Sequence, residues 1–147
     1  MDRRKFIAAT CISCMGGGLL LTLSEGCSTA SKIVSADISG SDMLVPLTSF
    51  EHTKAGKKEF SKYLVVQNDR LKYPICVYRF SETQYEALWM RCTHQGTELQ
   101  VFGDKMQCPA HGSEFNNHGQ VVNGPAANQL RTFPVSISDN LLRISLK

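Results

Sequence analysis

The pattern of apolar and polar residues divides the chain into two parts. Residues 6–23 form a stretch of 18 residues without a charged side chain, and it follows a charged head at residues 2–5. From residue 43 onward, apolar and polar positions alternate over short distances, and no stretch keeps the periodicity of an amphipathic helix. The pattern therefore predicts an N-terminal apolar segment followed by a domain of short strands.

Several stretches of the second part have the composition of strands. They are rich in aromatic and β-branched residues and comprise residues 59–66, 73–80 and 85–91. In the second of them Cys76 stands between Ile75 and Val77, so we interpret this cysteine as a buried thiol of the core.

The most regular pattern lies at the C-terminus. Apolar residues alternate with polar ones over residues 133–137 and again over residues 142–146, and Asp139 and Asn140 supply a two-residue turn between them. This pattern predicts an antiparallel hairpin. Together with the frequent turns it favours an all-β class, a small barrel or sandwich, over residues 43–147.

The N-terminal segment has the features of an export signal, a positive head before a short, weakly apolar stretch. As a helix, residues 6–23 would span about 27 Å, just enough for a membrane core, but consecutive glycines and hydroxyl side chains weaken this stretch as a permanent span. Arg3 and Arg4, followed by Lys-Phe-Ile, resemble the twin-arginine signal of proteins that are exported already folded. A general secretory signal or a signal anchor is the alternative.

Cys27 offers one way for this segment to end. The Leu-Ser-Glu-Gly sequence before it resembles a lipoprotein cleavage site, although the glutamate is unusual there. Lipidation of Cys27, ordinary cleavage after the small residues 28–30, and retention of the segment as a membrane anchor are three alternatives. We predict a signal or anchor over residues 1–26 and a tether, rich in small and polar side chains, over residues 27–42.

Composition excludes several functional classes. The formal net charge of this 147-residue chain is +3, too small for a nucleic-acid-binding protein, and no basic cluster stands out. With 42% hydrophobic and 20% charged residues the chain is not disordered. Six cysteines would allow three disulfides, but Cys11 and Cys14 lie in the apolar segment, where we interpret them as small apolar residues. We expect no disulfide.

Candidate chemistry is concentrated in two short segments. Cys92 and His94 occur as Cys-x-His, and Cys108 and His111 occur as Cys-x-x-His. Cysteine and histidine together are foremost metal ligands. In an extended loop, residues i and i+2 are roughly 6.6 Å apart, whereas two ligands of one zinc lie only about 3.5 Å apart. The spacing therefore favours two metals, with each segment giving its cysteine to one and its histidine to the other, and zinc remains an alternative.

The two segments, CTHQG and CPAHGS, resemble the signature of the Rieske [2Fe–2S] family. The resemblance implies one [2Fe–2S] cluster per chain, with Cys92 and Cys108 on one iron and His94 and His111 on the other. It also implies the Rieske fold over residues 43–147, a small β-barrel or sandwich with a cluster-binding insertion of two loops at about residues 91–127. The N-terminal apolar signal or anchor helix precedes this domain.

The resemblance also assigns residues around the cluster. Ser113 matches a serine whose hydroxyl points toward a cluster sulfide, whereas Phe115 stands where high-potential members have a tyrosine. Two further cysteines of those members, which form a disulfide, correspond here to Thr97 and Ala110. Fewer donors to sulfur imply a potential between those of ferredoxins and of bc-type proteins. Further residues expected to shape or cover the site are Gly96, Gly112 and, in a proline-containing loop, Pro125.

The function implied by this resemblance is one-electron transfer, and we expect no catalytic residue. The chain would be an electron-transfer protein or an oxidoreductase subunit rather than a stand-alone enzyme. It would be exported and attached through its N-terminus to the outer side of the cytoplasmic membrane. Redox partners would be a cytochrome b-type or cytochrome c-type protein, or the large subunit of a periplasmic oxidase, as in arsenite oxidase. Alternatives are the Rieske ferredoxin of a ring-hydroxylating dioxygenase and a zinc-stabilised binding module.

Overall fold

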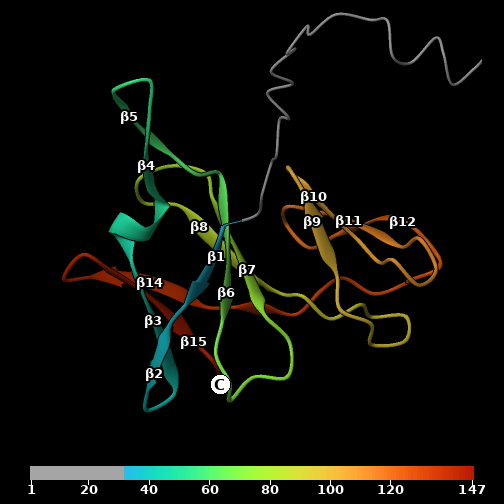
Figure 1. The fold of residues 1–147 in the computed structure, drawn as a ribbon. Coiled ribbons are helices and arrows are strands. Elements are labelled where there is room, and N and C mark those ends of the chain that lie inside the picture. Colours follow the sequence, from blue (N-terminus) through green and yellow to red (C-terminus); the bar gives the residue numbers. More distant parts are fainter. Residues whose placement is uncertain (1–31) are drawn as a thin grey trace, which may run out of the picture.

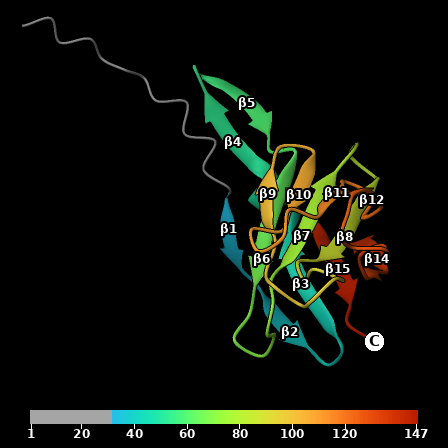
Figure 2. The same cartoon turned by 90° about the vertical axis from the view of Figure 1, so that its right-hand side faces the viewer.

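The computed structural model describes residues 32–147, and these residues form almost entirely β-structure (Figures 1 and 2). The one helical element among them is a 3-10 turn, η1 (Leu47–Phe50). Within residues 32–147 no helix is long and apolar enough to cross a bilayer. The predicted all-β class is confirmed. The predicted signal, with Arg3, Arg4, Cys11, Cys14 and Cys27, lies outside the described residues.

Two sheets face each other across the first hydrophobic core. The five-stranded sheet has the order β1 (Ile33–Ser35), β6 (Tyr63–Gln67), β7 (Ile75–Arg79), β8 (Tyr85–Trp89) and β13 (Thr132–Phe133). The four-stranded sheet has the order β14 (Val135–Ser138), β15 (Leu141–Ser145), β3 (Asp42–Pro46) and β2 (Asp37–Ser39). Buried side chains of both sheets pack together, among them Met43, Leu64, Val77 and Ile144.

A third sheet covers the opposite face of the central strands. Its order is β12 (Val121–Asn123), β11 (Glu114–Asn116), β10 (Lys105–Gln107) and β9 (Gln100–Phe102). A second core joins Val65, Cys76 and Leu88 of the five-stranded sheet to Met106 and Phe115 of this third sheet. Strand β7 is therefore buried on both faces, which explains why its sequence is a continuous apolar run rather than an alternating one.

The predicted C-terminal hairpin is present as β14 and β15. Asp139 and Asn140 form its turn, with φ angles of 52° and 59°. Two-residue hairpins favour such positive φ values because the turn then matches the right-handed twist of the strands. The predicted strand over residues 59–66 is instead divided at Ser61 between β6 and a separate hairpin, β4 (Glu51–Lys54) with β5 (Lys57–Phe60).

The last part of the predicted tether is folded. Strand β1 pairs in parallel with β6, and β2 pairs with β3, so regular structure begins at residue 33 rather than at 43. Most residues of this segment are small or polar, but the side chains of Val34, Ala36 and Ile38 pack against the first core. Burial of these three side chains offsets the entropy lost when the segment is ordered. The boundary predicted at residue 43 is corrected accordingly.

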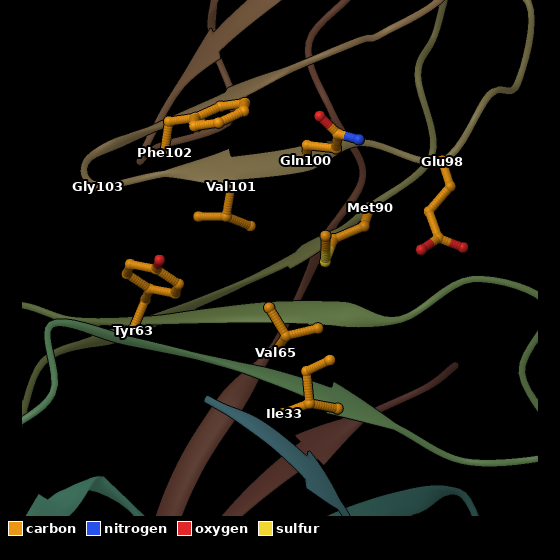
Figure 3. Close-up of a pocket in the computed structure, with 9 residues that line it drawn as sticks. All are labelled: Ile33, Tyr63, Val65, Met90, Glu98, Gln100, Val101, Phe102 and Gly103. Carbon is orange, nitrogen blue, oxygen red and sulfur yellow. The ribbon is translucent and has the colours of Figure 1, made fainter. Parts of the chain in front are cut away.

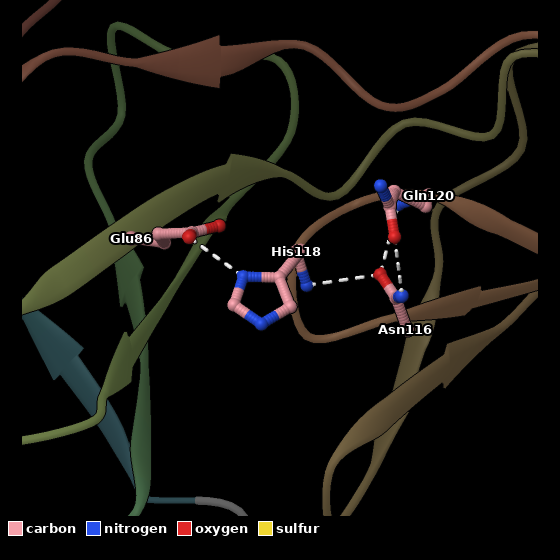
Figure 4. Close-up of polar contacts among 4 residues, drawn as sticks. All are labelled: Glu86, Asn116, His118 and Gln120. Atoms are coloured by element: carbon pink, nitrogen blue, oxygen red, sulfur yellow. Dashed lines mark hydrogen bonds and ion pairs between the residues drawn. The ribbon is translucent and has the colours of Figure 1, made fainter.

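His118 connects the third sheet to the five-stranded sheet. It lies in the turn between β11 and β12, and its Nδ1 is 2.7 Å from a carboxylate oxygen of Glu86 on β8 (Figure 4). Its ring stacks on Phe80 at a centroid distance of 4.9 Å. On the other side of the interface a groove of about 660 Å³ remains between β1, β6 and β9, with Ile33, Val65 and Val101 among its lining residues (Figure 3).

Candidate metal centre

The four predicted ligands lie in two loops with the same backbone hydrogen bonds. The first loop, residues 92–97, follows β8, and the second, residues 108–113, joins β10 to β11. In each loop the N–H of the cysteine donates to the carbonyl five residues later, from Cys92 to Thr97 and from Cys108 to Ser113. In each loop the glycine four residues after the cysteine donates back to the cysteine carbonyl. The two loops therefore share one backbone hydrogen-bond pattern, although their Cys-x-His and Cys-x-x-His spacings differ.

Both loops need glycine at this fourth position. Gly96 and Gly112 have φ angles of 78° and 79°, in the left-handed region that costs other residues about 1–2 kcal/mol. Gly96 is also crowded, because a Cβ there would lie 3.2 Å from a guanidinium nitrogen of Arg91. A Cβ at Gly112 would meet nothing within 4 Å. The resemblance assigned both glycines to the site. The backbone conformation disfavours a side chain at both positions, and the contact with Arg91 makes a substitution more costly at Gly96 than at Gly112.

This difference gives a testable pair of variants. We expect Gly112→Ala to lower the free energy of unfolding by about 1–2 kcal/mol through backbone strain alone, and Gly96→Ala to lower it further because Arg91 must also move. Urea unfolding followed by the fluorescence of Trp89 measures both. An equal or larger loss for Gly112→Ala would show that contact with Arg91 does not constrain the first loop.

The four candidate ligands form two pairs rather than one group. Cys92 and Cys108 are only 1% and 2% exposed, and the Cys92 side chain is among the groups that lower the pKa of the Cys108 thiol. The rings of His94 and His111 lie beside each other at the surface, with centroids 5.0 Å apart and planes at 86°. Within residues 32–147 no three cysteine, histidine or acidic side chains surround one point as ligands of a single ion do. The arrangement is a buried cysteine pair and an exposed imidazole pair, each drawn from both loops.

Hydrogen-bond donors surround the Cys108 sulfur. Burial by itself raises the pKa of this thiol, but the backbone N–H groups of Ala110 and His111, the Cys92 thiol and the Thr97 hydroxyl outweigh it and lower the pKa. The thiolate is the form of cysteine that binds metal. These donors therefore favour the state that a metal site requires, and Thr97 connects the first loop to the second.

The donor set fits a two-iron, two-sulfide cluster. Two thiolates and two imidazoles are the ligand set of the Rieske type, in which two histidines replace two cysteines on one of the irons. The observed separation into a sulfur pair and a nitrogen pair matches such a division between two irons. The pairs also come from both loops equally, so each loop contributes one ligand to each pair.

A third segment, residues 123–130, is fastened to both loops. The Ala126 N–H donates to Ser113 Oγ over 3.0 Å, and the hydroxyl of Thr93 donates to the Asn128 carbonyl over 2.6 Å. Ser113 is fully buried. Because its oxygen accepts from Ala126, its own proton is available for a further acceptor. Pro125 lies in the same segment and is exposed.

Several residues that support the first loop were missed by the sequence analysis. The Tyr73 hydroxyl donates to the Gly96 carbonyl over 2.6 Å, and the Tyr73 ring packs edge-on against Trp89. The Arg91 guanidinium lies 5.8 Å from the centre of the Trp89 ring. Tyr73 is distant in sequence from the first loop, and no spacing rule would have found it. Arg91 is adjacent to Cys92, and only that adjacency could have pointed to it.

The other cysteine expectations are consistent with the described residues. Cys76 is fully buried, and burial raises the pKa of its thiol, so the predicted core thiol is confirmed. Cys76, Cys92 and Cys108 are all free of disulfides. Phe115, which stands where the resemblance would place a tyrosine, is fully buried in the same core as Cys92 and Cys108.

Comparison with known proteins identifies the family. The Rieske [2Fe-2S] domain family matches residues 51–134. The cytochrome b6-f complex iron-sulfur subunit of Microcystis aeruginosa is 32% identical over 120 residues, which cover 76% of this chain and 61% of that protein. Iron-sulfur subunit 3 of the cytochrome b6-f complex of Nostoc sp. is 29% identical over 143 residues, covering 96% and 70%.

A solved structure agrees with this assignment. The plasma membrane Rieske protein PetC3 from Synechocystis PCC 6803 has 30% sequence identity and a TM-score of 0.50, and the match covers 57% of this chain and 86% of that one. The chain spans about three fifths of the length of the Microcystis relative. Family match, structural likeness and donor set agree that this chain belongs to the Rieske [2Fe–2S] family and carries a [2Fe–2S] cluster.

Proposed function

We propose that this chain is a one-electron carrier of a membrane-associated redox complex. The observation that carries the proposal is that the same two loops supply a buried cysteine pair and an exposed imidazole pair. Cys92 and Cys108 would hold one iron and His94 and His111 would hold the other. When bound, the cluster supplies reversible one-electron chemistry. The exposed imidazoles bring the metal centre to the surface, where an electron can pass to or from a partner.

The residues of the chain tune this site more than they react in it. Neutral imidazoles in place of two thiolates make the oxidised centre uncharged, so an electron enters it more readily than it enters an all-cysteine site. The donors on Cys108 stabilise negative charge on sulfur, and they therefore also favour entry of an electron. Thr97 supplies one of these donors, but Phe115 supplies none. We therefore propose a potential between those of the ferredoxins and of the bc-type proteins.

Ser113 provides a test of this tuning. We expect Ser113→Ala to lower the midpoint potential, because a hydroxyl that donates to a cluster sulfide stabilises the reduced state. A loss of about 1.4 kcal/mol of this preference corresponds to about 59 mV for one electron. Protein-film voltammetry measures the shift. An unchanged midpoint together with a lower melting temperature would mean that Ser113 only accepts the Ala126 N–H and holds the covering segment.

Membrane attachment is proposed to come from the N-terminus. Arg3 and Arg4 would direct export of the folded, cluster-loaded protein, and Cys27 would carry a lipid anchor on the outer side of the cytoplasmic membrane. The relatives are subunits of cytochrome b6-f complexes, which supports a cytochrome-type partner within a membrane complex. Only five residues separate Cys27 from the first strand, so the anchor would hold the domain within about 20 Å of the membrane.

Export has a direct test in the native host or a related bacterium. We expect Arg3→Lys/Arg4→Lys to leave the iron-loaded protein in the cytoplasm, and Cys27→Ser to release exported protein from the membrane fraction. Cell fractionation with visible absorbance of the cluster distinguishes these results. Normal export of the double lysine variant with its cluster would contradict the twin-arginine route, and continued membrane retention of Cys27→Ser would contradict lipidation.

A further inference from the structure

The three loops around the candidate ligands carry no fixed charge. Residues 92–97, 108–113 and 123–130 contain no aspartate, glutamate, lysine or arginine. Any long-range electrostatic attraction between this end of the molecule and a partner must therefore come from the residues that border the loops. Among these bordering residues, basic side chains are concentrated on one side of the loops.

Three cations gather on one side, around the aromatic side chains that support the first loop. The guanidinium groups of Arg91 and Arg131 lie 5.8 and 5.6 Å from the centre of the Trp89 ring. The ammonium group of Lys72 lies 5.4 Å from the centre of the Tyr73 ring. Cation–π contacts of this kind restrict long basic side chains that would otherwise be mobile. We call Lys72, Arg91 and Arg131 the cationic shoulder.

The shoulder is continuous with the first ligand loop. Arg91 packs directly against Gly96, and the Tyr73 hydroxyl binds the Gly96 carbonyl. Arg131 is further held by hydrogen bonds to the carbonyl oxygen of Leu146 and to a terminal carboxylate oxygen of Lys147, each over 3.3 Å. The charges are thus fixed in position relative to the loop that carries His94.

Within residues 32–147 no aspartate or glutamate forms an ion pair with the shoulder, although Arg131 contacts the terminal carboxylate of Lys147. All four ion pairs within residues 32–147 involve other basic groups, namely His52, Lys58, Lys105 and His118. Glu98 is opposite Arg91 in an isolated β-bridge, but the two side chains form no ion pair. All three basic residues are exposed. A cluster of exposed cations, of which Lys72 and Arg91 have no anionic partner among the described residues, attracts an acidic surface.

We propose that the cationic shoulder docks a redox partner protein through carboxylates on that partner, next to its electron-transfer site. The uncharged loops then form the close contact, while the shoulder steers the encounter and fixes its orientation. This inference rests on the proposed electron-transfer function, and it adds the charge of the partner and the side of the molecule on which it binds.

The test compares oxidants of opposite charge. Stopped-flow absorbance follows the reduced protein as it passes one electron to ferricyanide, giving ferrocyanide, or to tris(phenanthroline)cobalt(III), giving the cobalt(II) complex. For Lys72→Gln/Arg91→Gln/Arg131→Gln at low ionic strength we expect the ferricyanide rate to fall, on the order of 10-fold, and the cobalt rate to rise. A change in potential or a damaged cluster would move both rates in the same direction.

The matched control removes the same charge from the β4–β5 hairpin. Lys54→Gln/Lys57→Gln/Lys58→Gln also lowers the net charge by three, at residues that are all exposed. We expect this control to change both rates far less. If it changes them as much as the shoulder variant does, only the net charge matters and the proposed surface is overturned. Lys72→Gln/Arg131→Gln keeps Arg91 and its contact with Gly96, so it tests the shoulder even if Arg91→Gln disturbs the loop.

Protein oxidants test docking itself. We expect an acidic plastocyanin to oxidise the wild-type protein faster than a basic cytochrome c does, and we expect this advantage to disappear in the shoulder variant and at high salt. An advantage that survives removal of the shoulder would overturn the proposal. Electron transfer would still occur if the advantage survived, so the proposed function would stand. Absence of any one-electron oxidation of the reduced protein would instead contradict the proposed function.

Discussion

Cys108→Ser is expected to yield a protein without its [2Fe–2S] cluster. The serine hydroxyl is a much weaker metal ligand than a thiolate, and Cys108 is the position at which four donors stabilise the thiolate. Loss of one of four ligands should leave almost no iron and no visible absorbance in the purified protein. Iron and sulfide analysis with visible spectroscopy measures this directly.

Cys76 supplies the matched control for this experiment. It is another free and fully buried cysteine in the same core, but burial raises its thiol pKa instead of stabilising the thiolate. We expect Cys76→Ala to retain two irons per chain and to cost only the modest stability of a small cavity. Equal loss of iron from both variants would show that cluster content reports core integrity, and it would remove the support for Cys108 as a ligand.

The second large effect is expected at the two histidines. In His94→Cys/His111→Cys a cluster that assembles would have four thiolate ligands and a net charge of −2 when oxidised, whereas the natural centre is neutral. The midpoint should fall from the Rieske range of about −150 to +300 mV toward the value of about −400 mV typical of plant-type ferredoxins. Spectroelectrochemical titration with EPR detection measures the change.

Two further measurements keep this prediction decisive. If the double variant holds no iron, His94→Ala and His111→Ala should each lose the cluster as well, which still identifies both residues as ligands. His118→Gln is the control, because His118 pairs with Glu86, stacks on Phe80 and belongs to neither ligand loop. Its midpoint should stay unchanged. A normal potential in His94→Cys/His111→Cys would contradict histidine ligation.

Sequence reasoning was sufficient for the ligand loops because their chemistry is local. Cys92 and His94, and likewise Cys108 and His111, are close in sequence, and soft sulfur with imidazole nitrogen has few uses other than metal binding. The C-terminal hairpin was predicted for the same reason, since alternation and a two-residue turn are both short-range signals. The structure contains the hairpin and brings the two Cys/His segments together as neighbouring loops, and metal binding by their four side chains stays a prediction.

Features that depend on long-range packing were not predictable. Strands β1 and β2 carry only a few apolar side chains, and they are ordered by contacts with partners far along the chain. The support of Gly96 by Tyr73 joins residues 23 positions apart. The covering segment was expected from Pro125, but the two hydrogen bonds that fasten it come from Ala126 and Thr93. Side-chain directions of this kind are set by the assembled fold rather than by local sequence.

The central claim is that two cysteines and two histidines of this chain hold a two-iron cluster. The most direct measurement is metal and sulfide analysis of the purified protein, combined with pulsed EPR of the dithionite-reduced sample to detect nitrogen ligands. We predict two irons and two sulfides per chain and two imidazole nitrogens coupled to the reduced centre. A colourless protein with one zinc and no iron, or an iron–sulfur centre without nitrogen coupling, would contradict the account.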